Sequence, residues 1–257
     1  MDSDPARSQA AHRDIETPAP GSDRYLPRAR AIELIERLES DVEVETVTLI
    51  PPDTDLPSNL PDLAWLPENV RRNKAGLVVI SGPEILLALT SPFPVPAGSS
   101  SDFTELRKFA ARRRTVAIVL LRLGAYAVGV AVDGKLEVTK SDTRYVKGRH
   151  KAGGQSQRRF ERNREKWVRE LFDKACRDAK ERFAPFSASI DHLALGGDRQ
   201  VLNSFMKRCD ALSPLQDRLL PARVAVDRPN TGALETAARD LWSWRVHRAP
   251  ESSATGK

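Results

Sequence analysis

The sequence predicts an α/β fold of the α+β kind, in which a mixed β-sheet with a β-meander and flanking helices follows a small N-terminal α/β subdomain. Three observations lead to this prediction. Residues 115–121 form a nearly continuous apolar run, which is typical of a central strand. Asp133-Gly134 is a two-residue hairpin signal between two strand-like segments. Residues 156–183 repeat apolar side chains at helical spacing, which predicts one long helix with a buried stripe.

The first part of the chain predicts a short subdomain behind a disordered tail. Residues 1–24 lack hydrophobic periodicity and are expected to be that tail. The elements expected after it are a helix at 28–39 and strands at 42–50, 77–80 and 85–89. Residues 91–101 are rich in Pro and Ser and are expected to be a linker, which confines the first subdomain to residues 25–100.

The second part predicts a larger domain at residues 101–248, followed by a mobile tail at 249–257. Gly196-Gly197 is expected to turn the chain, and Asp198 to cap the helix that follows. The expected elements are, in order, a helix at 103–114, strands at 115–121, 126–132 and 136–146, the helix at 156–183, a strand at 193–195, a helix at 199–208, a strand at 223–226 and a helix at 231–247.

Composition and charge favour a nucleic-acid partner. The chain has 257 residues, a net charge of +6 and a pI near 9.5, which favours an anionic ligand. Cys176 and Cys209 belong to no C-x-x-C pair and have no nearby His pair, so two reduced, partly buried thiols are expected. No apolar run reaches transmembrane length, and the first residues lack a signal-peptide core. The sequence therefore predicts a cytoplasmic protein that acts on no membrane.

A glycine-rich loop precedes the long helix and carries the strongest motif in the chain. Gly153 and Gly154 make positive φ accessible and leave no Cβ to block the approach of another molecule. Gln155 offers amide donors and a carbonyl acceptor without a charge to desolvate, so it could orient a water molecule. Residues 144–166 contain nine Lys or Arg and two Glu, a net charge of +7 that exceeds the excess of the whole chain. A cationic loop with a bare, neutral tip suits entry into a phosphate-lined pocket.

These residues resemble a known family. The pattern Arg149-x-x-x-Gly153-Gly154-Gln155-Ser156-x-x-Arg159-Phe160-x-Arg162-x-Arg164 resembles the catalytic loop and the following helix of the class-I translation release factors of archaea and eukaryotes. Within that group the chain is most similar to the bacterial, in particular the actinobacterial, branch of the VLRF (Vms-like release factor) family, which are peptidyl-tRNA hydrolases. The resemblance covers roughly residues 28–248 and is specific around 144–164.

The resemblance implies a fold, an activity and a set of site residues. It implies the ribonuclease-H-like arrangement of the release-factor central domain. It implies hydrolysis of the peptidyl-tRNA ester at the peptidyl-transferase centre of the large ribosomal subunit, as in ribosome rescue, quality control or termination. No cofactor, metal or DNA partner is implied. The implied catalytic residues are Gly153, Gly154 and Gln155, and the implied RNA-binding residues are Arg149, His150, Lys151, Arg158, Arg159 and Arg162.

Two departures from the release-factor pattern concern codon recognition. Only about twenty residues separate Pro52 from Asn73, and they contain no Asn-Ile-Lys-Ser motif. The release factors place their stop-codon-reading helices in this interval. The given sequence also ends after the domain with the glycine-glycine-glutamine motif, without the third domain that recruits a partner GTPase. Both departures favour a codon-independent factor that acts on peptidyl-tRNA in stalled ribosomes or free large subunits.

The remaining candidate sites are expected to be structural. Asp191-His192 stands at a strand start, and Gly196-Gly197-Asp198 lacks the further glycines or the Lys of a phosphate loop. Trp167 falls on the buried stripe of the long helix and is expected in the core. The expected strand ends carry no acidic cluster, which argues against metal-dependent nuclease chemistry. Two other functions stay open: cleavage of the tRNA 3′ end, and a non-enzymatic ribosome-binding role.

Overall fold

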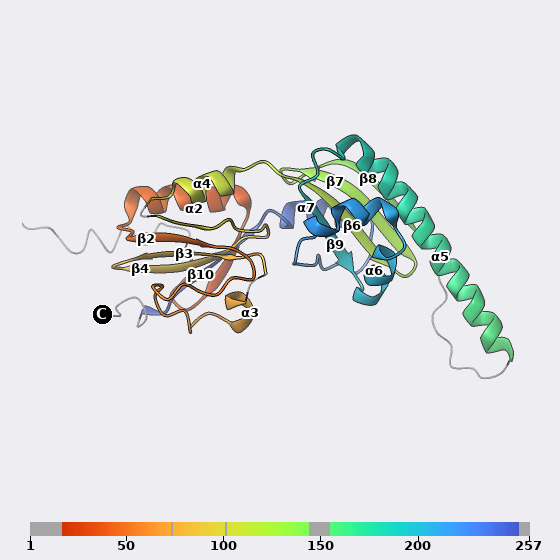
Figure 1. The fold of residues 1–257 in the computed structure, drawn as a ribbon, viewed down its shortest axis with the longest axis horizontal. Helices are drawn as coiled ribbons and strands as arrows, with labels where there is room; N and C mark the ends of the chain where they lie inside the picture. Colours follow the sequence, from red (N-terminus) through yellow and green to blue (C-terminus); the bar gives the residue numbers. More distant parts are fainter. Residues whose placement is uncertain (1–16, 73, 101, 144–154, 252–257) are drawn as a thin grey trace, which may run out of the picture. The chain divides into compact units, whose positions relative to one another are not determined.

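The chain folds into two compact units, each described by itself below. The computed structural model describes residues 17–72, 74–100, 102–143 and 155–251 (Figure 1). The first unit contains the chain up to Arg112 and again from Trp242 onward, and the second unit is Arg113–Leu241. The second unit is thus inserted into the first, and the chain passes between them twice.

The first unit is built on a six-stranded antiparallel sheet with the order β1-β10-β4-β3-β2-β5. Helices α2 (Arg28–Asp41) and α4 (Thr104–Ala111) pack together on one face of this sheet (Figure 1). A short helix, α3 (Glu68–Arg71), belongs to the segment that covers the opposite face. The strands are β1 (Asp23–Leu26), β2 (Thr46–Ile50), β3 (Leu77–Gly82), β4 (Ile85–Thr90), β5 (Gly98–Ser100) and β10 (Trp244–Arg248).

The domain boundary lies at a different place from the one that the sequence predicts. The Pro- and Ser-rich segment 91–101 is no linker, because Phe93 and Val95 are buried and β5 pairs with β2. Phe93 packs edge to face against Trp242, with 5.4 Å between the ring centroids. Helix α4, expected in the second domain, packs on α2 in the first. The boundary therefore falls between Arg112 and Arg113, about a dozen residues later than expected.

The end of the chain also differs from the prediction. The helix expected at 231–247 ends at Asp240 as α7 (Thr231–Asp240), and β10 follows as a strand of the first sheet. The expected terminal tails are shorter in the described residues, since β1 begins at Asp23 and Ala249 is buried. The Ala249 backbone N–H donates to the Leu86 carbonyl at 3.0 Å, so the chain stays attached to the sheet one residue beyond β10.

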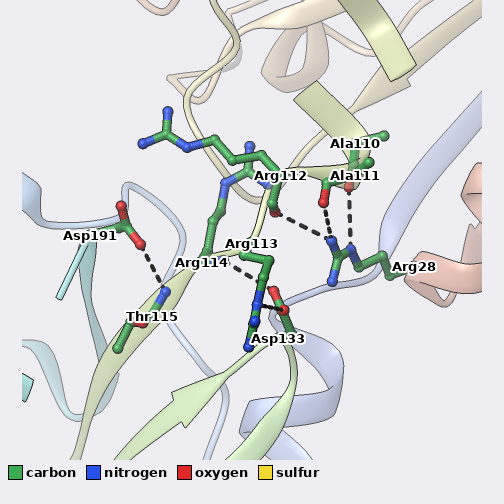
Figure 2. Close-up of polar contacts among 9 residues, drawn as sticks. All are labelled: Arg28, Ala110, Ala111, Arg112, Arg113, Arg114, Thr115, Asp133 and Asp191. Carbon is green, nitrogen blue, oxygen red and sulfur yellow. Dashed lines mark hydrogen bonds and ion pairs between the residues drawn. The ribbon is translucent and has the colours of Figure 1, made fainter. Parts of the chain in front are cut away.

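Side chains fix the backbone on each side of the first connection between the units (Figure 2). On the first unit's side, the Arg28 guanidinium donates to the carbonyls at the end of α4, to Ala110 at 3.2 Å and Ala111 at 2.7 Å. On the other side, Asp133 accepts from the Arg113 side chain at 2.9 Å and from the Arg114 backbone N–H at 3.1 Å. The Arg28 guanidinium at the C-terminus of α4 is also favoured by the dipole of that helix. Each unit thus holds its own end of the connection.

The second unit confirms the mixed sheet. Strands β6 (Thr115–Arg122), β7 (Ala125–Val132) and β8 (Lys135–Thr143) form an antiparallel meander, and β9 (His192–Gly197) pairs in parallel with β6, in the order β8-β7-β6-β9. The hairpin signal is confirmed, because Asp133 and Gly134 both have positive φ, 50° and 85°. Helices α5 (Gln155–Phe183) and α6 (Arg199–Met206) share a core with one face of the sheet.

Two further differences concern the segment after α6. The strand expected at 223–226 is reduced to a single isolated bridge, between Gly196 and Val224. A 3-10 helix, η2 (Asp210–Arg218), precedes it and places Leu212 and Leu215 in the core. Pro214 lies inside η2 and has no backbone N–H to donate. Helix α7 covers the other face of the sheet, where a Cβ at Gly129 would lie 2.8 Å from the Val138 carbonyl oxygen.

Candidate functional site

Helix α5 is much longer than the sheet that it covers, and its first part forms a projecting arm. The 29 residues of α5 correspond to about 43 Å of helix. Val168 is the first of its described side chains to pack against the core, and no side chain from Arg162 to Glu170 is buried. The arm, defined here as Gln155–Lys166, therefore spans about 18 Å of helix beyond the packed part. Figure 1 shows α5 running on past the ends of the strands beside it.

The structure places only part of the predicted site. Gly153, Gly154, Arg149, His150 and Lys151 lie outside the described residues.

The remaining predicted site residues lie on the arm. Gln155 is the first residue of α5, and Arg158 and Arg159 lie in its first turns, where only the backbone is described. Arg162 is exposed. Ser156 lies inside the first turn rather than at the N-cap, because α5 begins one residue earlier than expected. The motif thus leads directly into the free end of the arm, where the first N–H groups of a helix have no intrahelical acceptors.

Three polar contacts fasten the packed part of α5 to the rest of its unit. The Lys174 ammonium pairs with the Asp142 carboxylate at the end of β8. The Tyr126 hydroxyl donates to the buried Asp178 carboxylate. Arg208, just after α6, donates to both oxygens of Asp173 at 2.8 and 3.2 Å. Contacts with β7, β8 and the end of α6 therefore fix the helix axis from several directions.

These contacts shift the pKa values of the groups involved. Hydrogen bonding from Lys174 lowers the pKa of Asp142, and hydrogen bonding from Arg208 lowers the pKa of Asp173. Burial, followed by the neighbouring Asp178, raises the pKa of the Tyr126 hydroxyl. Near neutral pH the two carboxylates are therefore ionised and Tyr126 is a neutral donor.

A disulfide bond corrects the prediction of two reduced thiols. Cys176 of α5 and Cys209 after α6 are bonded, with 5.3 Å between their Cα atoms. Cys209 follows Arg208 directly, and Cys176 stands one turn after Asp173 on α5. The salt bridge and the disulfide thus join the same two segments. Their 33-residue separation could not reveal this, because only the packing of α6 against α5 brings the sulfur atoms together.

The other candidate motifs have structural roles, as expected. Gly197 has a φ of +121°, and a Cβ there would lie 2.0 Å from the Leu121 carbonyl oxygen, so the turn requires glycine. Asp198 caps α6 by accepting from the backbone N–H groups of Gln200 and Val201. A carboxylate at that position opposes phosphate binding at the same helix end. Asp191 accepts from the Thr115 backbone N–H at 2.8 Å (Figure 2) and so ties the start of β9 to that of β6.

Three further results concern metal sites, membrane spans and the burial of Trp167. Among the described residues, no group of three or more His, Cys, Asp or Glu side chains is placed to hold a metal ion. Likewise, no helix in the described part of the chain is long and apolar enough to cross a membrane. Trp167, expected in the core, is only half-buried, because it lies where α5 leaves the packed body.

Comparisons with known proteins point to one family. A family model described as the Actinobacteria/chloroflexi VLRF1 release factor matches residues 114–247, just over half of the chain. Peptide chain release factor subunit 1 of Archaeoglobus fulgidus is 30% identical over 146 residues, which cover 54% of this chain and 36% of that protein. The same factor of Aeropyrum pernix is 36% identical over 87 residues, covering 34% of this chain and 23% of that protein. The matched segments thus span well under half of each relative's length.

Solved structures with similar chains include two archaeal proteins. An archaeal translation termination factor, aRF1, has a TM-score of 0.39 at 16% identity, covering 84% of this chain and 70% of that chain. Pelota of Archaeoglobus fulgidus has a TM-score of 0.33 at 12% identity, covering 88% of this chain and 65% of that chain.

Proposed function

This chain belongs to the family of actinobacterial and chloroflexi VLRF1 release factors, and on that premise we propose that it is a peptidyl-tRNA hydrolase. Its substrate is the ester between the nascent peptide and the 3′-terminal adenosine of tRNA, held at the peptidyl-transferase centre of a stalled ribosome or a free large subunit. The observation that carries the proposal is the position of Gly153-Gly154-Gln155, directly before the free end of an arm of about 18 Å.

Ester hydrolysis at this centre requires a positioned water molecule and stabilisation of the tetrahedral oxyanion. The Gln155 amide orients the water and does not act as a base, since it has no proton acceptor other than its carbonyl oxygen. Gly153 and Gly154 allow close approach of RNA because neither carries a Cβ. Ribosomal RNA and the tRNA ribose 2′-hydroxyl provide the rest of the catalytic environment. Arg149, His150, Lys151, Arg158, Arg159 and Arg162 bind phosphate groups.

The form of the arm supports this assignment. A narrow helix with the motif at its tip can reach a recessed substrate while the packed part of the protein stays outside the pocket. The contacts that Asp173, Lys174 and Asp178 of α5 make with the rest of the unit lie behind the arm, so they fix its direction without entering the site. Positioning of this kind is the main contribution that a protein can make where RNA supplies most of the pocket.

We propose that release does not depend on the codon. The interval between Pro52 and Asn73 is short, and its apolar residues Leu63, Leu66 and Val70 are buried against the first unit's sheet. These residues cover a core, so few remain to read a codon. A factor with this substrate would work in the cytoplasm, with the ribosome and peptidyl-tRNA as partners.

Purified ribosome–nascent-chain complexes test the proposal through the identity of the product. Hydrolysis yields a free peptide and a tRNA with an intact 3′ CCA end. A shortened tRNA, with the peptide still esterified to the cleaved 3′ fragment, would instead establish tRNA cleavage. Wild-type protein that binds the complexes and changes neither the peptide nor the tRNA would establish a non-enzymatic factor.

A further inference from the structure

A second cationic surface lies on α5, on the side turned away from the core. Its members are three, four or seven residues apart, so they fall on one side of the helix. Every one of them is exposed, and Lys166 and Asp173 each take part in an ion pair described below. We call this set the α5 stripe, and its members are Arg162, Lys166, Arg169, Asp173, Arg177 and Lys180.

The stripe is strongly positive in spite of its one acid. Asp173 accepts from Nε and Nη2 of the Arg208 guanidinium, which adds a cation from outside the helix and neutralises the carboxylate. The charges of Arg177 and Arg169 also lower the pKa of Asp173. Lys166 is 4.0 Å from Glu170, and this exposed pair is weak. The stripe thus contains five cations and a single carboxylate, which Arg208 binds, so its net charge is positive near neutral pH.

The stripe is long and held in place from behind. From Arg162 to Lys180 it extends about 27 Å along the helix, with members roughly one helical turn apart. The core-facing side of the same helix is anchored by the buried residues Leu171, Ala175 and Ala179. A row of cations on a fixed helix is preorganised to meet a row of phosphates, so little ordering is needed on binding.

We propose that the α5 stripe is a docking surface for the phosphate backbone of large-subunit ribosomal RNA. The proposal rests on the proposed function, because it takes the tip at Gln155 to be at the peptidyl-tRNA ester. The stripe begins about 10 Å behind that tip and ends about 37 Å behind it. At those depths the flank of the helix faces the wall of the pocket, which is ribosomal RNA, whereas the tRNA 3′ end is at the tip.

The test compares two triple variants with the same loss of charge. The first changes Arg169, Arg177 and Lys180 to Gln, behind the residues assigned to the site. The matched control changes Arg199, Arg223 and Arg228 to Gln, which are exposed cations of the same unit outside α5. Binding to large subunits is measured over a salt series, and the Tm of each variant is recorded. Loss of three phosphate contacts lowers the slope of log K against log salt by about 2.

The stripe variant is expected to show that smaller slope and weaker binding at low salt, with an unchanged slope for the control. Restoring charge with Lys at positions 169 and 177 is expected to recover most of the slope. Equal slopes for the stripe variant and the control would overturn the proposal and leave the stripe as a solvated face. Backbone footprinting adds a second criterion: protections on ribosomal RNA that the stripe variant loses support the proposal, and protections on tRNA alone overturn it.

Peptide release separates this proposal from the proposed function. At saturating concentration the stripe variant is expected to release peptide at the wild-type rate, because docking and chemistry use different residues. If Gln155→Ala abolishes release while the stripe variant binds like the control, only the docking surface is refuted. If Gln155→Ala releases at the wild-type rate while the stripe variant loses salt dependence, only the hydrolase assignment is refuted.

Discussion

Replacing Asn163 by proline tests whether the arm must be a continuous helix. Asn163 is exposed and lies within the arm, eight residues after its start. Proline there removes the hydrogen bond from residue 163 to the carbonyl of Arg159 and collides with that carbonyl, which costs about 3 kcal/mol. The eight residues before it gain at most about 0.3 kcal/mol each from helix propagation, or about 2 kcal/mol together. The free-energy cost of the substitution therefore exceeds the free energy that keeps this part of the arm helical.

Asn163→Pro is expected to free the tip while leaving the body folded. Hydrogen exchange at residues 155–162 should increase strongly, and the Tm should stay within about 2 °C of wild type, because this segment contributes no described core residue. Single-turnover peptide release at saturating protein should fall by about a hundredfold, the scale expected when a catalytic group loses its position. Asn163→Ala, which keeps the helix, is the control and should release within about twofold of wild type. Wild-type release by the proline variant, with increased exchange, would show that the arm need not be rigid.

Three further predictions concern the motif, the codon and pH. Gln155→Ala should bind ribosomes normally and lose release by about a hundredfold in single-turnover assays, whereas His150→Ala should lose much less; a wild-type rate for Gln155→Ala would refute the hydrolase assignment. Release from complexes stalled on stop, sense or absent codons should be equal within about tenfold, or about 1.4 kcal/mol, and a larger preference for stop codons would contradict codon independence. The lowered pKa of Asp142 means that its pairing with Lys174 stabilises the fold above about pH 4 and is lost as pH falls further. Asp142→Asn should therefore lower the Tm more at pH 7 than at pH 3, and an equal loss at both pH values would rule out this origin.

Local patterns predicted the second sheet well, because its meander is made of neighbours in the sequence. The apolar run of β6, the Asp133-Gly134 turn and the stripe of α5 each act within a few residues. The same reasoning predicted the long helix after the glycine-rich motif within one residue of its observed start at Gln155. It could not predict the orientation of the arm. That orientation depends on contacts such as the one between Lys174 and Asp142, which are 32 residues apart in the sequence.

Three predictions failed where long-range packing decided the structure. Leu234, Ala238 and Leu241 continue a helical spacing toward Trp242, so no local signal ends the helix at Asp240. Trp244–Arg248 becomes a strand because it completes the first sheet between β1 and β4. The Pro- and Ser-rich composition of 91–101 indicated a flexible linker, yet Phe93 is buried against Trp242. The disulfide has the same cause, because it depends on how α6 packs and not on a cysteine motif.

The position of β10 also bears on what the family match describes. The matched residues 114–247 contain the second unit except Arg113, and nearly all of β10. Val246 and Trp244 in that strand are buried by the first unit, and β10 pairs on both sides with strands of the first sheet. Residues 114–247 taken alone would therefore expose two apolar side chains and two unpaired strand edges. The second unit, Arg113–Leu241, is held at both ends by the first, so the segment that carries the motif is tethered twice to the unit that completes β10.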